Sequence, residues 1–392
     1  MTIETLFLLS SGLFLGWSLG ANDAGNVFGT AVGSRMIRFS TAVVVCSIFM
    51  VLGAVWSGEG VSRGLVELGS VNILGGAFMV ALAAAIAVFL MLRTGIQVST
   101  TQALIGSLLG WNAFAGVATD ITVFLQVVST WVLGPLLAAA MAMAMMWAAK
   151  LILRNSRIGL IRLDGYTRLA LLGSGALGAY SLGANNIANV VAVFLPSQPF
   201  PALSWQGFES SPTQLLLLVG GIAMASGVLT YSRRTIELVG SGLANLSPLA
   251  AWICVSAHSI VLLLFASASL KAWLQSKGLP SLPLVPVSSS QAILGAILGV
   301  GLLRGGRDIN WGRVGRVALG WLITPLVASL LCFLGLFILQ NVFSCGLSTR
   351  PFFWWQSAVL HPLHLLLDQK FLPVAEAWPC TGTGALIPAN HL

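Results

Sequence analysis

Long apolar stretches with few charged residues recur from one end of this sequence to the other, and they limit the fold more than any other feature. Only 8% of the residues are charged and the mean hydropathy is +0.93, whereas soluble domains carry about 25% charged residues. A soluble fold of 392 residues cannot bury so much apolar surface, so the solvent for most of the chain is a lipid bilayer. We predict an all-α integral membrane protein, because helices satisfy their own backbone polar groups inside a bilayer.

The formal net charge of +8 does not indicate nucleic-acid binding. The basic residues lie mainly in short loops between the apolar stretches and form no basic face or stripe, which a nucleic-acid surface requires. Such loops are typical of multi-pass membrane proteins. We expect a lipid bilayer as the surroundings and no nucleic-acid partner. The sequence also lacks an HExxH motif or a Ser/His/Asp set, so we do not expect an enzyme.

Two short patterns each occur twice, in the same order along the chain. Residues 18–26 read SLGANDAGN and residues 181–189 read SLGANNIAN. Residues 98–110 read VSTTQALIGSLLG and residues 287–299 read VSSSQAILGAILG. Two matches in one order indicate an internal repeat, so the chain is expected to consist of two related halves.

Positively charged loops give the two halves opposite orientations. The Arg-rich stretches 150–169 and 304–316, and the loop with Arg35 and Arg38, are cytoplasmic by the positive-inside rule. In the second half, the loop that corresponds to the Arg35–Arg38 loop is 197–211. It has no Lys or Arg and is placed outside. Corresponding loops on opposite sides require inverted-topology repeats. We predict about five membrane segments in each, some of them broken or re-entrant.

The predicted organisation has four parts. They are the first inverted repeat (1–149), a cytoplasmic basic linker (150–169), the second inverted repeat (170–340) and an external tail (341–392). Both termini are then external, and the plasma or inner membrane is the expected location. Cys345 and Cys380 in the tail would pair if it faces an oxidising compartment. A homodimer is compatible with this organisation.

The first pattern places Asn and Asp inside apolar stretches, at the same position in each half. These residues are poor in helix interiors and expensive in a membrane unless they meet ligands. The adjacent Gly20 and Gly183 would let each helix unwind and free carbonyl oxygens for a cation. Asp23 is the clearest ionisable residue in such a stretch and should bind a cation or a proton. We predict cation binding at Asp23, Asn26, Asn186 and Asn189, with a sodium site at Asn22, Asp23 and Asn185.

The second pattern places hydroxyl side chains directly before an apolar helix in each half. Hydroxyls and unpaired backbone N–H groups at a helix start form an anion site, aided by the positive end of the helix dipole. Two such starts facing each other would bind one tetrahedral oxyanion. The predicted substrate-binding residues are Ser99, Thr100, Thr101, Gln102, Ser288, Ser289, Ser290 and Gln291, together with Asn22 and Asn185.

Structural explanations compete with these assignments. Ser or Thr at a helix start is often only an N-cap, and Asn in a membrane helix often only joins helices. The GxxxG pairs at 106–110 and 295–299 are interpreted as packing surfaces. His258 lies in an apolar stretch of the second half and has no first-half counterpart, so we interpret it as a packed, hydrogen-bonded histidine.

The repeated patterns resemble the motifs of the inorganic phosphate transporter (PiT) family. Residues 20–30 (GANDAGNVFGT) are similar to its GANDVAN-AFGT signature, and residues 98–101 and 287–290 are similar to its VSTT segments. The resemblance runs over about residues 10–340 and leaves the tail uncovered. It implies an inverted-repeat core that couples oxyanion uptake to Na⁺ or H⁺.

Three positions depart from the family pattern. Asn186 stands where the family usually has Asp, and Gln102 and Gln291 stand where it usually has His. The first change removes a carboxylate from the predicted cation sites, and the other two remove the obvious proton carriers. The coupling ion is therefore open between Na⁺ and H⁺, and the substrate is open between phosphate and sulfate.

The sequence as a whole favours a cation-coupled symporter of inorganic phosphate that works by alternating access. A sulfate or other oxyanion permease of the same fold is the alternative. An ion channel is less favoured because the polar residues cluster at two levels and do not line a continuous pore. A non-transporting receptor would bind substrate without flux.

Overall fold

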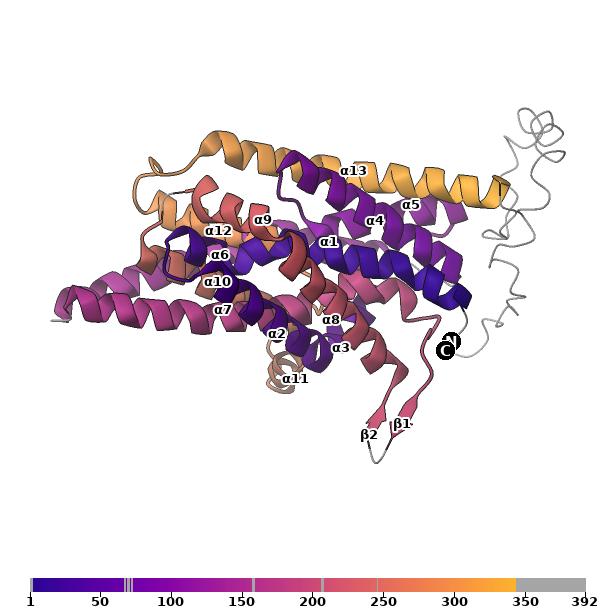
Figure 1. Ribbon diagram of the computed structural model, residues 1–392, viewed down its shortest axis with the longest axis horizontal. Helices are drawn as coiled ribbons and strands as arrows, with labels where there is room; N and C mark the ends of the chain where they lie inside the picture. The colour runs from indigo at the N-terminus through magenta and orange to yellow at the C-terminus, as the bar shows by residue number, and fades with distance from the viewer. Residues whose placement is uncertain are drawn as a thin grey trace.

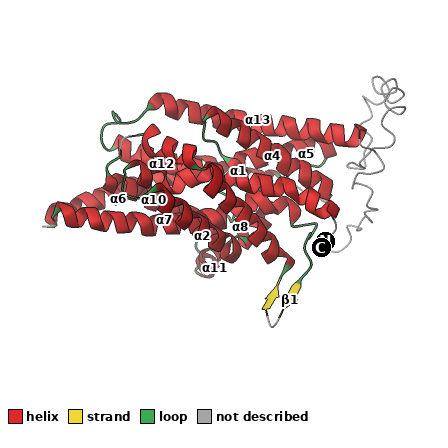
Figure 2. Cartoon of the chain, viewed as in Figure 1, coloured by secondary structure: helices red, strands yellow, loops and turns green. Residues whose placement is uncertain are grey.

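The computed structural model describes residues 3–342 except for 67, 69–70, 72, 157–158, 206–207 and 245. Cys345 and Cys380, predicted to pair in the tail, lie outside the described residues. Helices make up most of the described chain (Figure 2), which confirms the predicted all-α class.

The first half forms six helices. They are α1 (Ile3–Gly33), α2 (Phe39–Ser57), α3 (Glu59–Val66), α4 (Leu74–Thr94), α5 (Thr100–Ala115) and α6 (Ile121–Asn155). Each apolar stretch is thus a helix, and α3 is a short addition. Glycines stop two of these helices. Gly95 directly follows α4 and Gly116 directly follows α5, and their φ angles of 76° and 66° are in the left-handed region that favours glycine. At the start of α6, the Asp120 side chain accepts hydrogen bonds from the N–H groups of Thr122 and Val123.

The second half repeats this order with additions. Its elements are α7 (Leu160–Val191), a 3₁₀ turn (Ala192–Phe194), β1 (Leu203–Trp205), β2 (Phe208–Ser210), α8 (Pro212–Tyr231), α9 (Arg233–Glu237), a π turn (Leu238–Gly242), α10 (Pro248–Ala266), α11 (Ala268–Ser276), α12 (Ser289–Leu302) and α13 (Trp311–Val342). The stretch 197–211, expected as a plain loop, contains an antiparallel hairpin of β1 and β2 that projects from the bundle (Figure 1). The linker 150–169 is mostly helical, because α6 and α7 extend into it.

Most helices of one half pack against helices of the other half. Helix α1 lies against α8 and α2 against α7, and in the same way α5 lies against α13 and α12 against α6. Figure 1 shows α13 along one edge of the bundle, beside α4 and α5. These are matched pairs, because α1 corresponds to α7, α2 to α8, α5 to α12 and α6 to α13. The sequence repeat is therefore also a repeat in the packing.

Seven helices of the described chain are long and apolar enough to cross a membrane: α1, α2, α4, α6, α8, α10 and α13. Helix α7 has the length but carries charged residues and asparagines. Helices α5 and α12 have 16 and 14 residues, whereas a full crossing takes about 20. The chain is therefore a multi-pass membrane protein with two shortened helices.

Gly20 and Gly183 do not interrupt their helices. We expected each to unwind its helix beside the asparagines, but α1 and α7 are continuous through them. A Cβ atom at Gly20 would lie 1.8 Å from the carbonyl oxygen of Met224, and one at Gly183 would lie 2.0 Å from that of Met50. The expectation was wrong because both glycines are needed for close packing, α1 against α8 and α7 against α2.

The GxxxG pairs are packing surfaces, as predicted. A Cβ atom at Gly106 would lie 2.2 Å from the carbonyl oxygen of Pro325 in α13, and one at Gly295 would lie 2.2 Å from that of Pro135 in α6. The short helices α5 and α12 are therefore pressed against the long final helix of the opposite half.

Candidate functional site

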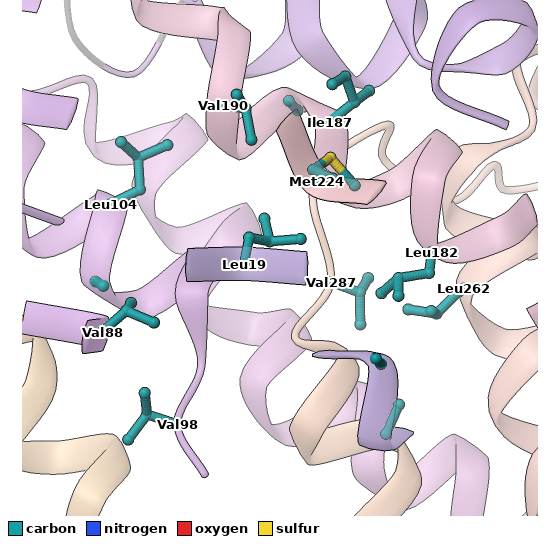
Figure 3. Close-up of a cluster of buried hydrophobic side chains, with 14 of the residues drawn as sticks. Leu19, Val88, Val98, Leu104, Leu182, Ile187, Val190, Met224, Leu262 and Val287 are labelled. Carbon is teal, nitrogen blue, oxygen red and sulfur yellow. The ribbon is translucent and has the colours of Figure 1, made fainter. Parts of the chain in front are cut away.

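Two segments without regular secondary structure bring the hydroxyl-rich motifs into the interior. Residues 96–99 lead into α5, and residues 279–288 lead into α12. Val98 and Val287, one residue before each motif, are completely buried. Figure 3 shows Val287 beside Leu182 and Leu262, in the apolar surroundings of the second motif. Each short helix therefore starts inside the protein.

The first serine of each motif caps its helix. The Ser99 side chain accepts a hydrogen bond from the N–H of Gln102 at 3.2 Å, and Ser288 accepts one from the N–H of Gln291 at 3.4 Å. Both caps have extended backbone conformations. The structural explanation thus holds for these two hydroxyls. The next two residues of each motif lie in the first turn, where backbone N–H groups have no acceptor within the helix.

The first asparagine of each GAN motif binds the backbone of the segment from its own half. The side chain of Asn22 donates to the carbonyl of Val98 at 2.7 Å and accepts from its N–H at 3.3 Å. Asn185 does the same with Val287, at 2.8 and 3.2 Å. These amide–backbone pairs hold each short helix start against α1 or α7. Asn22 and Asn185, predicted to bind ligand, thus also tie these two segments to α1 and α7.

The Asp23 carboxylate is surrounded by side-chain donors from both halves. Its Oδ1 accepts from Asn22 at 2.7 Å and from Asn26 at 3.2 Å, and its Oδ2 accepts from Asn186 at 2.8 Å and from Thr100 at 3.3 Å. Asp23 is 1% exposed. Among the described residues no Lys, Arg or His bonds to it, so only neutral hydrogen-bond donors stabilise a negative charge on Asp23.

The last asparagine of each motif reaches the helix start of the opposite half. The amino group of Asn26 donates to the Ser289 hydroxyl at 3.0 Å, and that of Asn189 donates to the Thr101 hydroxyl at 3.0 Å. These bonds connect α1 to α12 and α7 to α5. The four predicted segments therefore meet in one buried polar cluster that contains residues of both halves.

All fourteen predicted site residues lie in or beside this cluster, and none is more than 4% exposed. Three of them have a buried oxygen without a hydrogen-bond donor among the described residues. These atoms are Asn189 Oδ1, Gln102 Oε1 and Gln291 Oε1. A buried acceptor without a donor is costly, and a bound cation or a substrate hydroxyl would satisfy it.

Sequence reasoning missed two further members of the cluster. Gln97 donates to the side-chain oxygen of Asn26 and, at 3.3 Å, to the carbonyl of Asn22. His258 is hydrogen-bonded, as predicted, but its Nε2 lies 2.9 Å from the hydroxyl of Ser289, at the site and not in remote packing. The available signals were a glutamine directly before the first motif and an ionisable residue in an apolar stretch.

Comparison with known proteins identifies a family. The model of the phosphate transporter family matches residues 19–332, with a second match over residues 282–377. The second match extends beyond residue 340, where we expected the resemblance to end.

Curated relatives show the same similarity over most of the chain. A protein named as a phosphate permease in Methanocaldococcus jannaschii is 26% identical over 323 residues, covering 82% of this chain and 93% of the relative. A protein named as a low-affinity inorganic phosphate transporter in Mycobacterium bovis is 26% identical over 332 residues, covering 83% of this chain and 75% of the relative.

A solved structure described as the sodium-dependent phosphate transporter has a similar fold. It superimposes with a TM-score of 0.71 at 20% identity, over 87% of this chain and 100% of that chain. Its helices thus follow nearly the whole path of this protein. The family match over residues 19–332, the paired motifs and the shared fold lead to one conclusion: this chain belongs to the phosphate transporter family, a family of transport proteins and not of enzymes.

Proposed function

We propose that the protein is a sodium-coupled symporter of inorganic phosphate that works by alternating access. The observation that carries this proposal is the buried cluster in which two helix starts from opposite halves lie beside a single carboxylate. A helix start favours an anion and a buried carboxylate favours a cation, so the cluster suits the binding of both together.

The oxyanion would bind between the first turns of α5 and α12. Thr101 on one side and Ser289 and Ser290 on the other would supply hydroxyls. The unpaired N–H groups of the first turns would come from these residues and from Thr100, whose hydroxyl donates to Asp23. No cationic side chain bonds to these residues in the described part of the chain. A site built from dipoles holds phosphate without the strong ion pair that would slow its release.

Phosphate is favoured over sulfate by the unpaired amide oxygens of Gln102 and Gln291. Phosphate keeps at least one proton at neutral pH, and that hydroxyl needs an acceptor. Sulfate carries no such proton, so it would leave both oxygens unpaired, which costs about 1–3 kcal/mol for each buried group. A sulfate permease is therefore the second candidate.

The coupling cation would bind at Asp23, with Asn186 and Asn189 of α7 as neutral partners. Asn189 Oδ1 is the one buried, unpaired amide oxygen on α1 and α7 among the described residues. Oxygen ligands of this kind suit Na⁺. The sodium dependence named for the structural relative also favours Na⁺ over H⁺. The wider ligand set predicted from the sequence, with Asn22, Asn26 and Asn185, belongs to the same proposal.

The proposed topology follows the charge pattern. Residues 1–149 and 170–340 would be inverted repeats in the plasma or inner membrane, joined by a cytoplasmic linker at 150–169, with both termini outside. A homodimer fits this arrangement.

Uptake of radiolabelled phosphate into proteoliposomes tests the proposal. A sodium gradient should drive saturable uptake that sulfate does not block, whereas a proton gradient alone should not drive it. Uptake driven by H⁺ alone would reassign the coupling ion, and direct transport of sulfate would reassign the substrate. Binding without flux would contradict transport itself.

A further inference from the structure

His258 of α10 is joined to the candidate site by one hydrogen bond. Its Nε2 lies 2.9 Å from the hydroxyl oxygen of Ser289, and the whole residue is 0% exposed. Its Nδ1 has no partner among the described residues. A buried imidazole with one bond and one unpaired nitrogen raises the question of which ring nitrogen carries the proton.

The neighbouring carboxylate determines which way Asn26 points. An ionised carboxylate only accepts hydrogen bonds, so the Asn26 group at Asp23 Oδ1 must be its amino group. Gln97 donates to the oxygen of the same amide, which agrees with this orientation. The Asn26 amino group also lies 3.0 Å from the Ser289 hydroxyl, so Ser289 accepts this bond.

The Ser289 hydroxyl has one hydrogen and two possible arrangements. If it donates to His258 Nε2, that hydrogen is used within the protein. If His258 carries its proton on Nε2, Ser289 accepts from both Asn26 and His258, and its hydrogen is free to donate elsewhere. The second arrangement turns Ser289 into an obligate donor at the start of α12, beside the unpaired N–H groups of the first turn.

We propose that His258 is a positioning residue that holds the Ser289 hydroxyl as a donor to the bound oxyanion. This inference rests on the proposed phosphate site and makes the Ser289 hydroxyl a hydrogen-bond donor there. The corresponding first-half residue, Thr100, cannot serve in the same way, because its hydroxyl donates to Asp23. The oxyanion would thus receive a hydroxyl donor at Ser289 that the corresponding position of the first half, Thr100, does not supply.

Sodium-driven uptake of radiolabelled phosphate into proteoliposomes, measured on the full chain, tests the role of His258. His258→Met keeps the volume and removes the Nε2 donor, so KM for phosphate should rise about tenfold, the value of one hydrogen bond, with Vmax little changed. His258→Gln places an amide N–H near the position of Nε2 and should keep KM within about twofold of the wild type. A fall in Vmax and folded yield at constant KM in both variants would contradict the proposal.

A double-mutant cycle with Ser289→Ala separates positioning from packing. If His258 acts through the hydroxyl, His258→Met should add almost nothing in the Ser289→Ala background, so the double variant should stay near tenfold and not reach about a hundredfold. Independent, multiplied effects would overturn the inference. Absence of phosphate uptake by the wild type would instead contradict the proposed function, which keeps the two failures distinct.

Discussion

Asn26 in the first half and Asn189 in the second half occupy corresponding positions but have different surroundings. Asn26 lies between a carboxylate, Asp23, and the amide of Gln97. Asn189 has Asn186 in place of the aspartate, and its own side-chain oxygen has no donor among the described residues. The two halves thus share helices, caps and backbone ties, whereas charge and hydrogen-bond saturation are concentrated in the first half. The fold is therefore repeated, whereas the polar cluster is asymmetric, with its carboxylate in the first half.

The two halves are alike in their helix packing, and substitutions that disturb this packing should have the largest effects. Gly20→Ala and Gly183→Ala each force a Cβ atom to within 2.0 Å of a backbone oxygen, so we expect both to abolish the folded protein. Gly173→Ala is the control, because a Cβ atom there has nothing within 4 Å. Folded yield measured by size-exclusion chromatography checks this. A large difference between the first two variants would mean that the halves do not pack equivalently.

Charge is the part in which the halves differ, and Asp23→Asn tests it. Loss of the only carboxylate in the described cluster should reduce sodium-driven phosphate uptake by at least about 100-fold, because the proposed cation site loses its charge. The protein should stay folded, since the amide fits the same space.

The exchange of the pair, Asp23→Asn with Asn186→Asp, keeps one carboxylate beside one amide. We expect it to recover part of the lost uptake, because Asn186 already bonds Asp23 at 2.8 Å. No recovery would show that the charge must lie on α1. Normal uptake by Asp23→Asn alone would remove this residue from the mechanism.

Asn186→Asp alone would make the two halves equal in charge. Two carboxylates in contact repel each other and need an additional cation, so uptake at low sodium should fall at least about tenfold and its dependence on sodium should become steeper. Asn186→Ala removes the same N–H donor without adding a charge and is the control. An unchanged sodium dependence in the aspartate variant would contradict a cation site at this contact.

Gln97→Ala should give the smallest effect. It leaves the Asn26 oxygen as unpaired as that of Asn189, which costs about 1–3 kcal/mol for a buried group. We expect a lower melting temperature and an apparent sodium affinity about fivefold weaker. Gln126→Ala is a matched control, because this glutamine lies in a surface cavity of about 540 Å³ away from the site. An equal effect in both variants would mean that Gln97 has no special role.

Much of the architecture could be predicted from the sequence, because bilayers require apolar helices and because the two repeated motifs have nearly identical sequences. The membrane segments and the residues of the site follow from these two facts. The unwinding at Gly20 was predicted wrongly, since a glycine beside asparagines has the same appearance whether it breaks a helix or admits a neighbour. The helix that packs against Gly20 is determined by the tertiary structure and cannot be read from the local sequence.

The partners within the site were also beyond prediction. Asn22 and Asn185 were predicted to bind ligand, and the fold adds that their amides pair with the backbone of Val98 and Val287. His258 was assigned to packing, because no short-range pattern connects α10 with Ser289. Sequence motifs therefore identify the polar residues of this site. Which of their side chains bond to the protein backbone and which keep an unpaired polar atom depends on distances that only the fold supplies.

The close crossing of α1 and α8 has a consequence for how the protein is made. Gly20 emerges from the ribosome well before its neighbour Met224, by roughly 10–40 s at ordinary rates of synthesis. During that interval the glycine groove of α1 faces lipid or the insertion machinery, and the Asp23 carboxylate lacks the bond from Asn186. The first half is thus incomplete on its own, because α8 covers the face of α1 that carries Gly20 and α7 supplies a donor to Asp23.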